Sequence, residues 1–143
     1  MSSSPRRQSR EVALQALYAW QLSGGDALEE LKALDGFHDS DKTLARSLVS
    51  GVRDRAAELQ ALIAPHVDRG FDKLSPVERA ILYIGTYELS EHPRTPFKVV
   101  LNEAIELGKS FGGTEGHRFV NGVLEKVAAD LRPEEVAKHR NSA

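Results

Sequence analysis

The sequence predicts an all-α protein of about seven helices, arranged as two packed antiparallel helical bundles. Apolar residues recur at helical spacing through most of the 143 residues. No segment shows the sustained alternation of apolar and polar residues that is typical of a strand. The predicted helices are joined by short loops, which favours antiparallel packing of neighbouring helices.

The first predicted helix, SREVALQALYAWQLS, follows a Ser-rich lead over residues 1–5 and stops at Gly24-Gly25. Its core face carries Val12, Ala13, Ala16 and Trp20. Its other face carries Arg7, Arg10, Leu14 and Tyr18. This helix therefore combines a core face with a basic face that holds an aromatic ring.

A short helix is predicted around residues 26–34, ending at Gly36. Ser40 is the predicted N-cap of a long helical pattern that extends over residues 44–63. Gly51 and Pro65 indicate that this pattern is broken or kinked into two pieces.

The clearest helix start is SPVE, which combines Ser75 as N-cap, Pro76 at the first helical position and Glu78 as the partner in a capping box. The helix that it begins ends at His92-Pro93. Thr95-Pro96 repeats the cap-then-proline pattern and predicts the start of the next helix.

Gly112-Gly113 is predicted to end that helix, and Thr114 to cap a last one over residues 115–130, which stops at Arg132-Pro133. Within it, Asn121-Gly122 between valines is a signal for a tight hairpin turn. The helix is favoured because the apolar residues fall within one arc at 100° per residue: Val120, Val123, Leu124, Val127 and Leu131. Since glycine costs about 1 kcal/mol inside a helix, Gly122 indicates close approach of another helix or of a nucleic-acid strand.

We expect residues 1–143 to form one domain, because a chain of this length buries enough surface for an independent core. Residues 6–70 and 74–131 are predicted as two subdomains that share this core. Residues 1–5 and 134–143 are polar and are expected to be flexible tails.

The composition excludes several classes of protein. The sequence has no cysteine, which excludes disulfide scaffolds and thiol catalysis and agrees with a reducing cytoplasm. No apolar run is long enough for a membrane span, and the N-terminus lacks the apolar stretch of a signal peptide. The net charge of -2 argues against indiscriminate coating of nucleic acid. A cytoplasmic protein without a membrane partner is expected.

No catalytic or cofactor motif emerges, so we expect no enzyme activity and no cofactor. Gly108-Lys109-Ser110 resembles the end of a phosphate-binding loop, but Glu103 occupies the position of the first glycine and a helix precedes the motif. The five histidines form no close helical pair that would suggest a metal site. No serine lies in a G-x-S-x-G elbow.

Two groups of residues are candidates for binding RNA. Arg7 and Arg10 can pair with phosphate oxygens, and Tyr18 beside them offers a ring on which a base can stack. Phe119 lies off the apolar stripe of its helix, beside Arg118 and Gly122. The alternatives are a solvated basic helix end for the first group and the edge of the core for Phe119.

Three blocks resemble the NusB family of transcription antitermination factors, over roughly residues 6–131. They are RRQSREVALQALYAWQLS, LSPVERAILYIGTYEL and PFKVVLNEAIELGKSFGGTEGHRFVNGVLEK. The resemblance implies two packed helical bundles and a non-enzymatic role in bacterial transcription. Proteins of this family pair with NusE, a small-subunit ribosomal protein, and bind the single-stranded boxA element of nascent RNA. The complex joins RNA polymerase and suppresses premature termination, notably on ribosomal RNA operons.

The family's RNA-facing positions correspond here to Arg6, Arg7 and Arg10 and to the aromatic residues Tyr18 and Phe119. With Arg118, Asn121 and Gly122, which adjoin Phe119, they complete the predicted RNA-binding set. Glu78 matches a position on the NusE-facing side, so it is the predicted partner-binding residue. Some members of the family dimerise, and the sequence leaves monomer or homodimer open.

Three arginine contacts to a single strand give a salt slope of only about -2, which favours RNA binding that depends on a partner. Replacing Arg7 and Arg10 together by alanine is expected to weaken RNA binding and to preserve helicity. The rival from another class is a helical protein–protein adaptor without RNA binding. A second rival is the related RNA-binding domain of certain ribosomal RNA methyltransferases, but those enzymes need a catalytic cysteine, which this sequence lacks.

Overall fold

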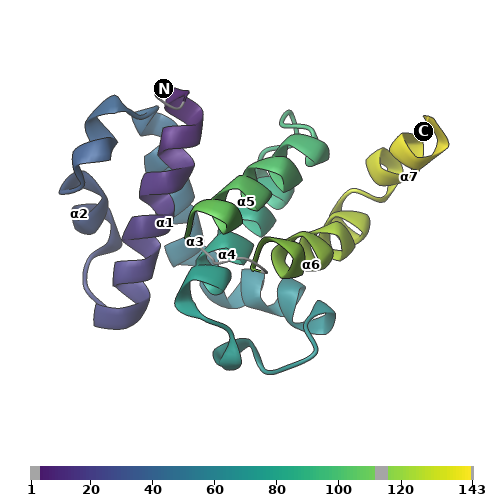
Figure 1. Cartoon of the computed structure of the whole chain (residues 1–143), viewed down its shortest axis with the longest axis horizontal. Coiled ribbons are helices and arrows are strands. Elements are labelled where there is room, and N and C mark those ends of the chain that lie inside the picture. The colour runs from purple at the N-terminus through teal and green to yellow at the C-terminus, as the bar shows by residue number, and fades with distance from the viewer. Residues whose placement is uncertain (1–3, 112–115, 143) are drawn as a thin grey trace.

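The computed structural model describes residues 4–111 and 116–142, and in this part of the chain it contains helices and no strand. Figure 1 shows their arrangement. Seven α-helices and three 3-10 helices (η) follow in this order within the described residues: α1 (Pro5–Ser23), α2 (Ala27–Lys32), η1 (Asp35–Asp39), α3 (Lys42–Ile63), η2 (Ala64–His66), η3 (Phe71–Lys73), α4 (Pro76–Glu91), α5 (Phe97–Phe111), α6 (Gly116–Leu131) and α7 (Pro133–Ser142). The predicted all-α class is confirmed.

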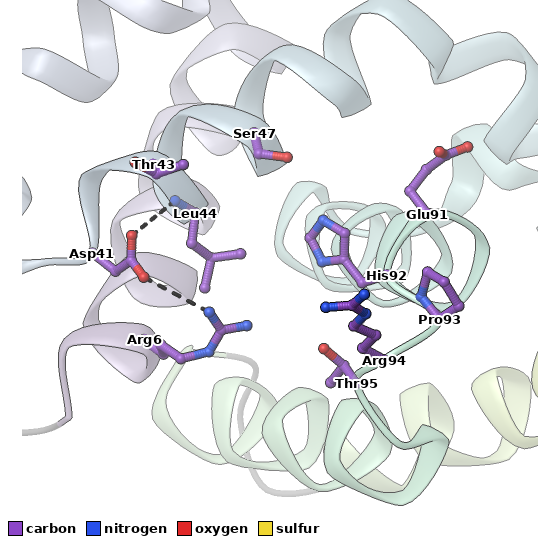
Figure 2. A pocket seen from close by; sticks show the side chains of 10 residues that line it. All are labelled: Arg6, Asp41, Thr43, Leu44, Ser47, Glu91, His92, Pro93, Arg94 and Thr95. Atoms are coloured by element: carbon purple, nitrogen blue, oxygen red, sulfur yellow. Dashed lines mark hydrogen bonds and ion pairs between the residues drawn. The ribbon is translucent and has the colours of Figure 1, made fainter.

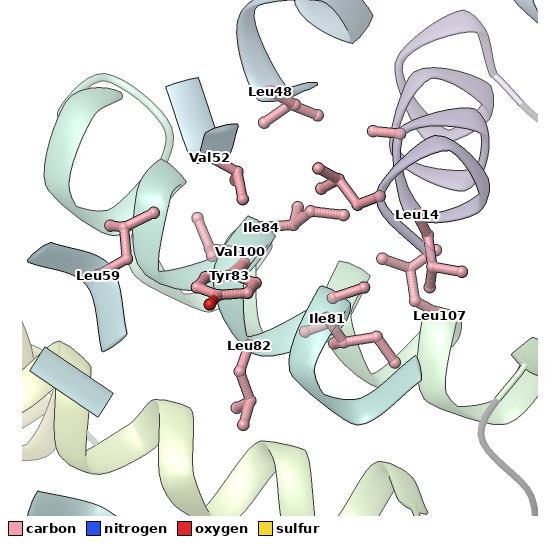
Figure 3. Close-up of a cluster of buried hydrophobic side chains, with 14 of the residues drawn as sticks. Leu14, Leu48, Val52, Leu59, Ile81, Leu82, Tyr83, Ile84, Val100 and Leu107 are labelled. Carbon is pink, nitrogen blue, oxygen red and sulfur yellow. The ribbon is translucent and has the colours of Figure 1, made fainter. Parts of the chain in front are cut away.

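Helices α1, α2 and α3 pack on one another, and α4, α5 and α6 form a second group, in agreement with two bundles. The groups share a core because α4 also packs against α1 and α3. Figure 3 shows this junction, where Leu14 of α1 and Leu48 of α3 lie near Ile81 and Ile84 of α4. None of the described helices is long and apolar enough to cross a membrane.

Helix α1 begins earlier than predicted. Ser4 is its N-cap, with its hydroxyl accepting from the Arg7 N–H at 3.1 Å, and Pro5 is the first helical residue. Its predicted end is confirmed, because Gly24 adopts a left-handed conformation with φ 71° that favours glycine. The arginines at positions 6 and 7 therefore lie on the first turn of a capped helix.

Helix α3 differs from its prediction at both its cap and its kink. Asp41, not Ser40, is the N-cap, because its carboxylate accepts the Leu44 N–H. The helix continues through Gly51, where a Cβ atom would lie 2.2 Å from the Tyr87 ring, so this glycine permits close packing of α3 against α4. The non-helical residue is Arg55, with φ −116° and ψ 19°.

The predicted start of α4 is confirmed in full. Ser75 accepts the Glu78 N–H at 3.1 Å and Glu78 accepts the Ser75 N–H at 3.1 Å, which completes the capping box. The helix ends at His92, as predicted. Its middle is buried on all sides, from Ala80 to Thr86, which makes α4 the centre of the fold.

The start of α5 and the C-terminal segment depart from prediction together. Thr95 does not cap α5; the Phe97 N–H donates instead to the carboxylate of Glu135, at 2.8 Å, from α7. The predicted flexible tail over residues 134–143 is wrong for its described part, because Pro133–Ser142 form α7, whose Val136 is buried. Gly112-Gly113 and Thr114, the predicted end of α5 and cap of α6, lie outside the described residues.

Arg132 explains why α7 is held against the protein. Its guanidinium donates to the carbonyl oxygens of Glu88, Leu89 and His92 at the end of α4, at 2.8–3.2 Å. It also pairs with Glu135 at 3.0 Å. The positive charge thus satisfies the last carbonyls of α4, which a helix leaves without partners.

Candidate nucleic-acid interface

The arginines near the start of α1 all have carboxylate partners. Arg6 lies 3.7 Å from Asp41, with half of its side chain exposed. Arg7 donates through Nε and Nη2 to the two oxygens of Glu103, at 3.0 and 2.8 Å. Its hydrogen bonds to Glu103 raise the pKa of Arg7. Both guanidiniums are accessible to a ligand, and both are partly neutralised from within the protein.

Arg10 does not lie on an exposed basic face, and that prediction is wrong. Only 4% of its side chain is exposed, and it forms a two-point ion pair with Glu88 of α4, at 2.8 and 2.9 Å. Burial would lower the pKa of Arg10, but the hydrogen bonds and charge of Glu88 raise it. The helical wheel could not show this because it places residues around α1 without showing that α4 covers one side.

Glu88 is correspondingly buried, with 1% of its side chain exposed. Burial would raise its pKa, whereas His92, whose Nδ1 lies 3.7 Å away, and Arg10 together lower it. A buried, charged pair of this kind joins the two helical groups. It holds the start of α1 against α4 and so positions Arg6 and Arg7.

Tyr18 lies farther along α1 with 40% of its surface exposed, as expected of a ring available for stacking. Arg7 has 44% of its side chain exposed. Leu14, which the helical wheel places with them, is buried in the shared core. The predicted face is therefore divided into an accessible part and a buried part.

The group on α6 is more open. Arg118 and Gly122 are exposed, and Phe119 is half-buried against the core. Asn121 donates to Glu125 on its own helix at 3.0 Å. A Cβ atom on Gly122 would meet nothing within 4 Å among the described residues, so no described helix approaches it closely. Of the two explanations for Gly122, close packing against another described helix is excluded.

A hollow of about 290 Å³ lies beside Phe119. It is lined by His66, Asp68, Arg118, Phe119, Gly122, Val123 and Lys126. The guanidinium of Arg69 lies 5.0 Å from the centre of the Phe119 ring, in a cation–π contact. Arg69, which also pairs with Asp68 at 3.2 Å, and Lys126 are cationic groups that sequence reasoning missed, because only the folded chain brings the 67–70 segment beside α6.

The two groups are separate surfaces. Helix α5 packs against both α1 and α6 and lies between them (Figure 1). Glu78 is on a third element, at the first turn of α4, where it is half-buried and committed to the capping box. In the described residues, no group of three or more acidic, histidine or cysteine side chains is placed to hold a metal ion.

Comparisons with known proteins agree with this architecture. A model of the NusB family matches residues 7–129. The chain is 49% identical to a transcription antitermination protein NusB of Burkholderia cenocepacia over 144 residues, covering 99% of both chains. It is also 49% identical to one of Burkholderia vietnamiensis, covering 99% of this chain and all of the relative.

Solved structures show the same fold. NusB of T. maritima is 30% identical, with a TM-score of 0.83 over 96% of this chain and 99% of that one. NusB in a complex of NusB and NusE with double-stranded RNA is 25% identical, with a TM-score of 0.75 over 87% of this chain and 96% of that one. The protein is thus one of the all-α transcription antitermination factors. It belongs to the NusB family.

Proposed function

We propose that this protein binds boxA-type single-stranded RNA together with NusE. The complex then joins the RNA polymerase elongation complex in the cytoplasm and supports processive transcription of ribosomal RNA operons. The role is one of binding, without catalysis. The proposal is supported by full-length similarity to NusB proteins and by a similar NusB chain solved with NusE and double-stranded RNA.

The observation that carries the RNA-binding part is the surface around Phe119. It combines an aromatic ring, a bare backbone at Gly122 and the positive charges of Arg118, Lys126 and Arg69. An unpaired base can stack on such a ring, and a phosphate can approach a helix that lacks a side chain at Gly122. A base paired within a duplex has no free face for this contact, which favours a single strand as the ligand.

The proposed RNA-binding set therefore loses one predicted member, Arg10, and gains Arg69 and Lys126. It retains Arg6, Arg7, Tyr18, Arg118, Phe119, Asn121 and Gly122. Arg10 acts as a positioning residue, because its guanidinium is buried on Glu88 and cannot reach a phosphate.

The charge arrangement also explains the need for a partner. Arg6 and Arg7 each have a carboxylate partner, so their net attraction for phosphate is reduced in the free protein. Interactions of this kind weaken steeply as salt rises. A second protein that shares the RNA supplies additional contacts in the same complex, and we place its docking side at Glu78 and the first turn of α4.

The test is a fluorescence-anisotropy titration of labelled boxA-type RNA, with and without NusE, at two salt concentrations and against a scrambled RNA. Tighter and sequence-selective binding in the presence of NusE is the expected result. Equal binding of both RNAs by the mixture would reject the proposal and favour a helical adaptor that binds only protein.

A further inference from the structure

A second hollow, separate from the one beside Phe119, lies where the two helical groups meet. It has a volume of about 430 Å³ and is bordered by the start of α1, the start of α3 and the loop that joins α4 to α5. Figure 2 shows Arg6 and Asp41 on one side and His92 and Arg94 on the other. The hollow thus brings together two arginines that are 88 positions apart in the chain.

The two guanidiniums are available to a ligand. Arg6 is half exposed and only loosely paired, at 3.7 Å from Asp41. Arg94 is exposed, and among the described residues its guanidinium has no hydrogen-bond or ion-pair partner. Hydroxyl groups that can donate to an oxyanion, those of Thr43 and Thr95, lie on the same walls.

The two carboxylates of the hollow are already engaged. Asp41 accepts the Leu44 N–H at 3.1 Å as the cap of α3 and also faces Arg6. Glu91 pairs with Arg55 from α3, which also pairs with Glu58. Both acids of the hollow therefore have a cationic partner, whereas Arg94 has no carboxylate partner among the described residues, and its charge is the one that can attract an anion.

The position of the hollow indicates which anion. Arg6 and Arg7 are consecutive on the first turn of α1, so their side chains diverge by about 100°. Arg7 extends towards Glu103 of α5, whereas Arg6 lines this hollow. A polyanion that contacts Arg7 while crossing the end of α1 therefore reaches Arg6 and the hollow next.

We propose that this hollow binds a backbone phosphate of the RNA, held by Arg94 and Arg6 and adjacent along the strand to the phosphate at Arg7. The inference rests on the proposed function and extends its RNA path onto the loop between α4 and α5. Arg94 is a residue that neither the helical pattern nor the resemblance singled out.

The first experiment compares Arg94→Ala with Arg140→Ala in the presence of NusE. Both substitutions remove one exposed arginine, but Arg140 lies on α7, away from the hollow. Loss of one phosphate contact should reduce the salt slope of boxA binding by about 0.7 and weaken binding about fivefold at 0.1 M salt. Arg140→Ala should change neither, and Arg94→Lys should retain most of the salt slope.

The second experiment locates the phosphate. Single neutral methylphosphonate linkages are placed in turn along the boxA RNA, and each RNA is titrated with the native protein and with Arg94→Ala. One linkage should weaken binding by the native protein and have no further effect on Arg94→Ala. If every linkage has the same effect on both proteins, Arg94 contacts no phosphate and the inference is wrong.

The outcomes separate the inference from the proposed function. If Arg7→Ala weakens boxA binding and Arg94→Ala does not, the inference fails and the proposed function stands. If the native protein with NusE does not distinguish boxA from scrambled RNA, the proposed function fails first. If Arg94→Ala weakens binding of NusE in the absence of RNA, the hollow is a protein contact and the inference is overturned.

Discussion

The two groups of candidate RNA-binding residues, on α1 and on α6, differ in what their side chains already contact. On α1, Arg6, Arg7 and Arg10 each face a carboxylate, and exposure falls from half of the Arg6 side chain to 4% of the Arg10 side chain. On α6, Gly122 has open space where a side chain would be, and Phe119 borders a hollow.

The difference shows that charge alone is a poor guide to a binding surface. An arginine in a sequence is equally suited to an internal carboxylate and to an external phosphate, because both accept two parallel hydrogen bonds. Burial distinguishes the two uses. Arg10 stabilises the fold. Arg7 pairs with Glu103 and is also exposed enough to contact a ligand. The α6 group is the surface most available to RNA.

The largest effect is expected from breaking the buried pair on the α1 side. Arg10→Ala leaves Glu88 buried without its main partner and should lower the free energy of unfolding by about 3–5 kcal/mol. Chemical denaturation followed by circular dichroism measures this loss. The double substitution of Arg7 and Arg10 by alanine, predicted from the sequence to preserve helicity, is therefore unsuitable as a test of RNA binding.

A double variant serves as the control for this prediction. Replacing Arg10 by methionine and Glu88 by leucine removes both charges and should recover most of the lost stability. Equal instability of the double variant and of Arg10→Ala would show that packing, and not an unpaired charge, causes the loss.

The same pair should make stability depend on acid pH. Because the pKa of Glu88 is lowered in the folded protein, its stabilising contribution is present above the unfolded-state value of about 4.3 and is lost as pH falls through the folded value. Denaturation of the native protein and of the Glu88→Gln variant across pH 3–7 measures this loss of stability. The difference in unfolding free energy between the two proteins should become smaller towards pH 3. A difference that does not change with pH would show that ionised Glu88 does not stabilise the fold.

On the α6 side, the expected effect is on binding and not on folding. Phe119→Leu keeps an apolar side chain at the edge of the core but removes the ring. It should weaken boxA binding with NusE by about 1–3 kcal/mol, the value of one stacked base. Anisotropy titration measures this change.

The smallest effect is expected from a substitution at Gly122, which should increase the stability of the fold and decrease the affinity for RNA. Gly122→Ala adds a methyl group in open space and replaces a poor helix former, so it should stabilise the protein by up to about 1 kcal/mol. The methyl group should at the same time weaken RNA binding. A stabilised variant with unchanged RNA affinity would show that no strand contacts this turn of α6.

The helices that were predicted well have local signals at both ends. Helix α4 begins at SPVE and ends at His92-Pro93, and every group needed for its cap lies within four residues. The start of α5 was predicted less well because its first N–H is satisfied by Glu135, 38 positions away. The C-terminal helix was missed for the same reason, since Arg132 anchors it to carbonyls of α4 that are about 40 positions away.

By itself the sequence determined the all-α class, the end of α1, both ends of α4 and the resemblance to the NusB family, because helical spacing, capping residues and motif order are local properties of a chain. The tertiary structure decided that Arg10 is buried, that Arg69 lies over Phe119, and that Arg6 and Arg94 border one hollow. These arrangements join residues about 50 to 90 positions apart. Electrostatic partners interact through space, so the periodicity of the sequence does not predict which charged residues lie together after folding.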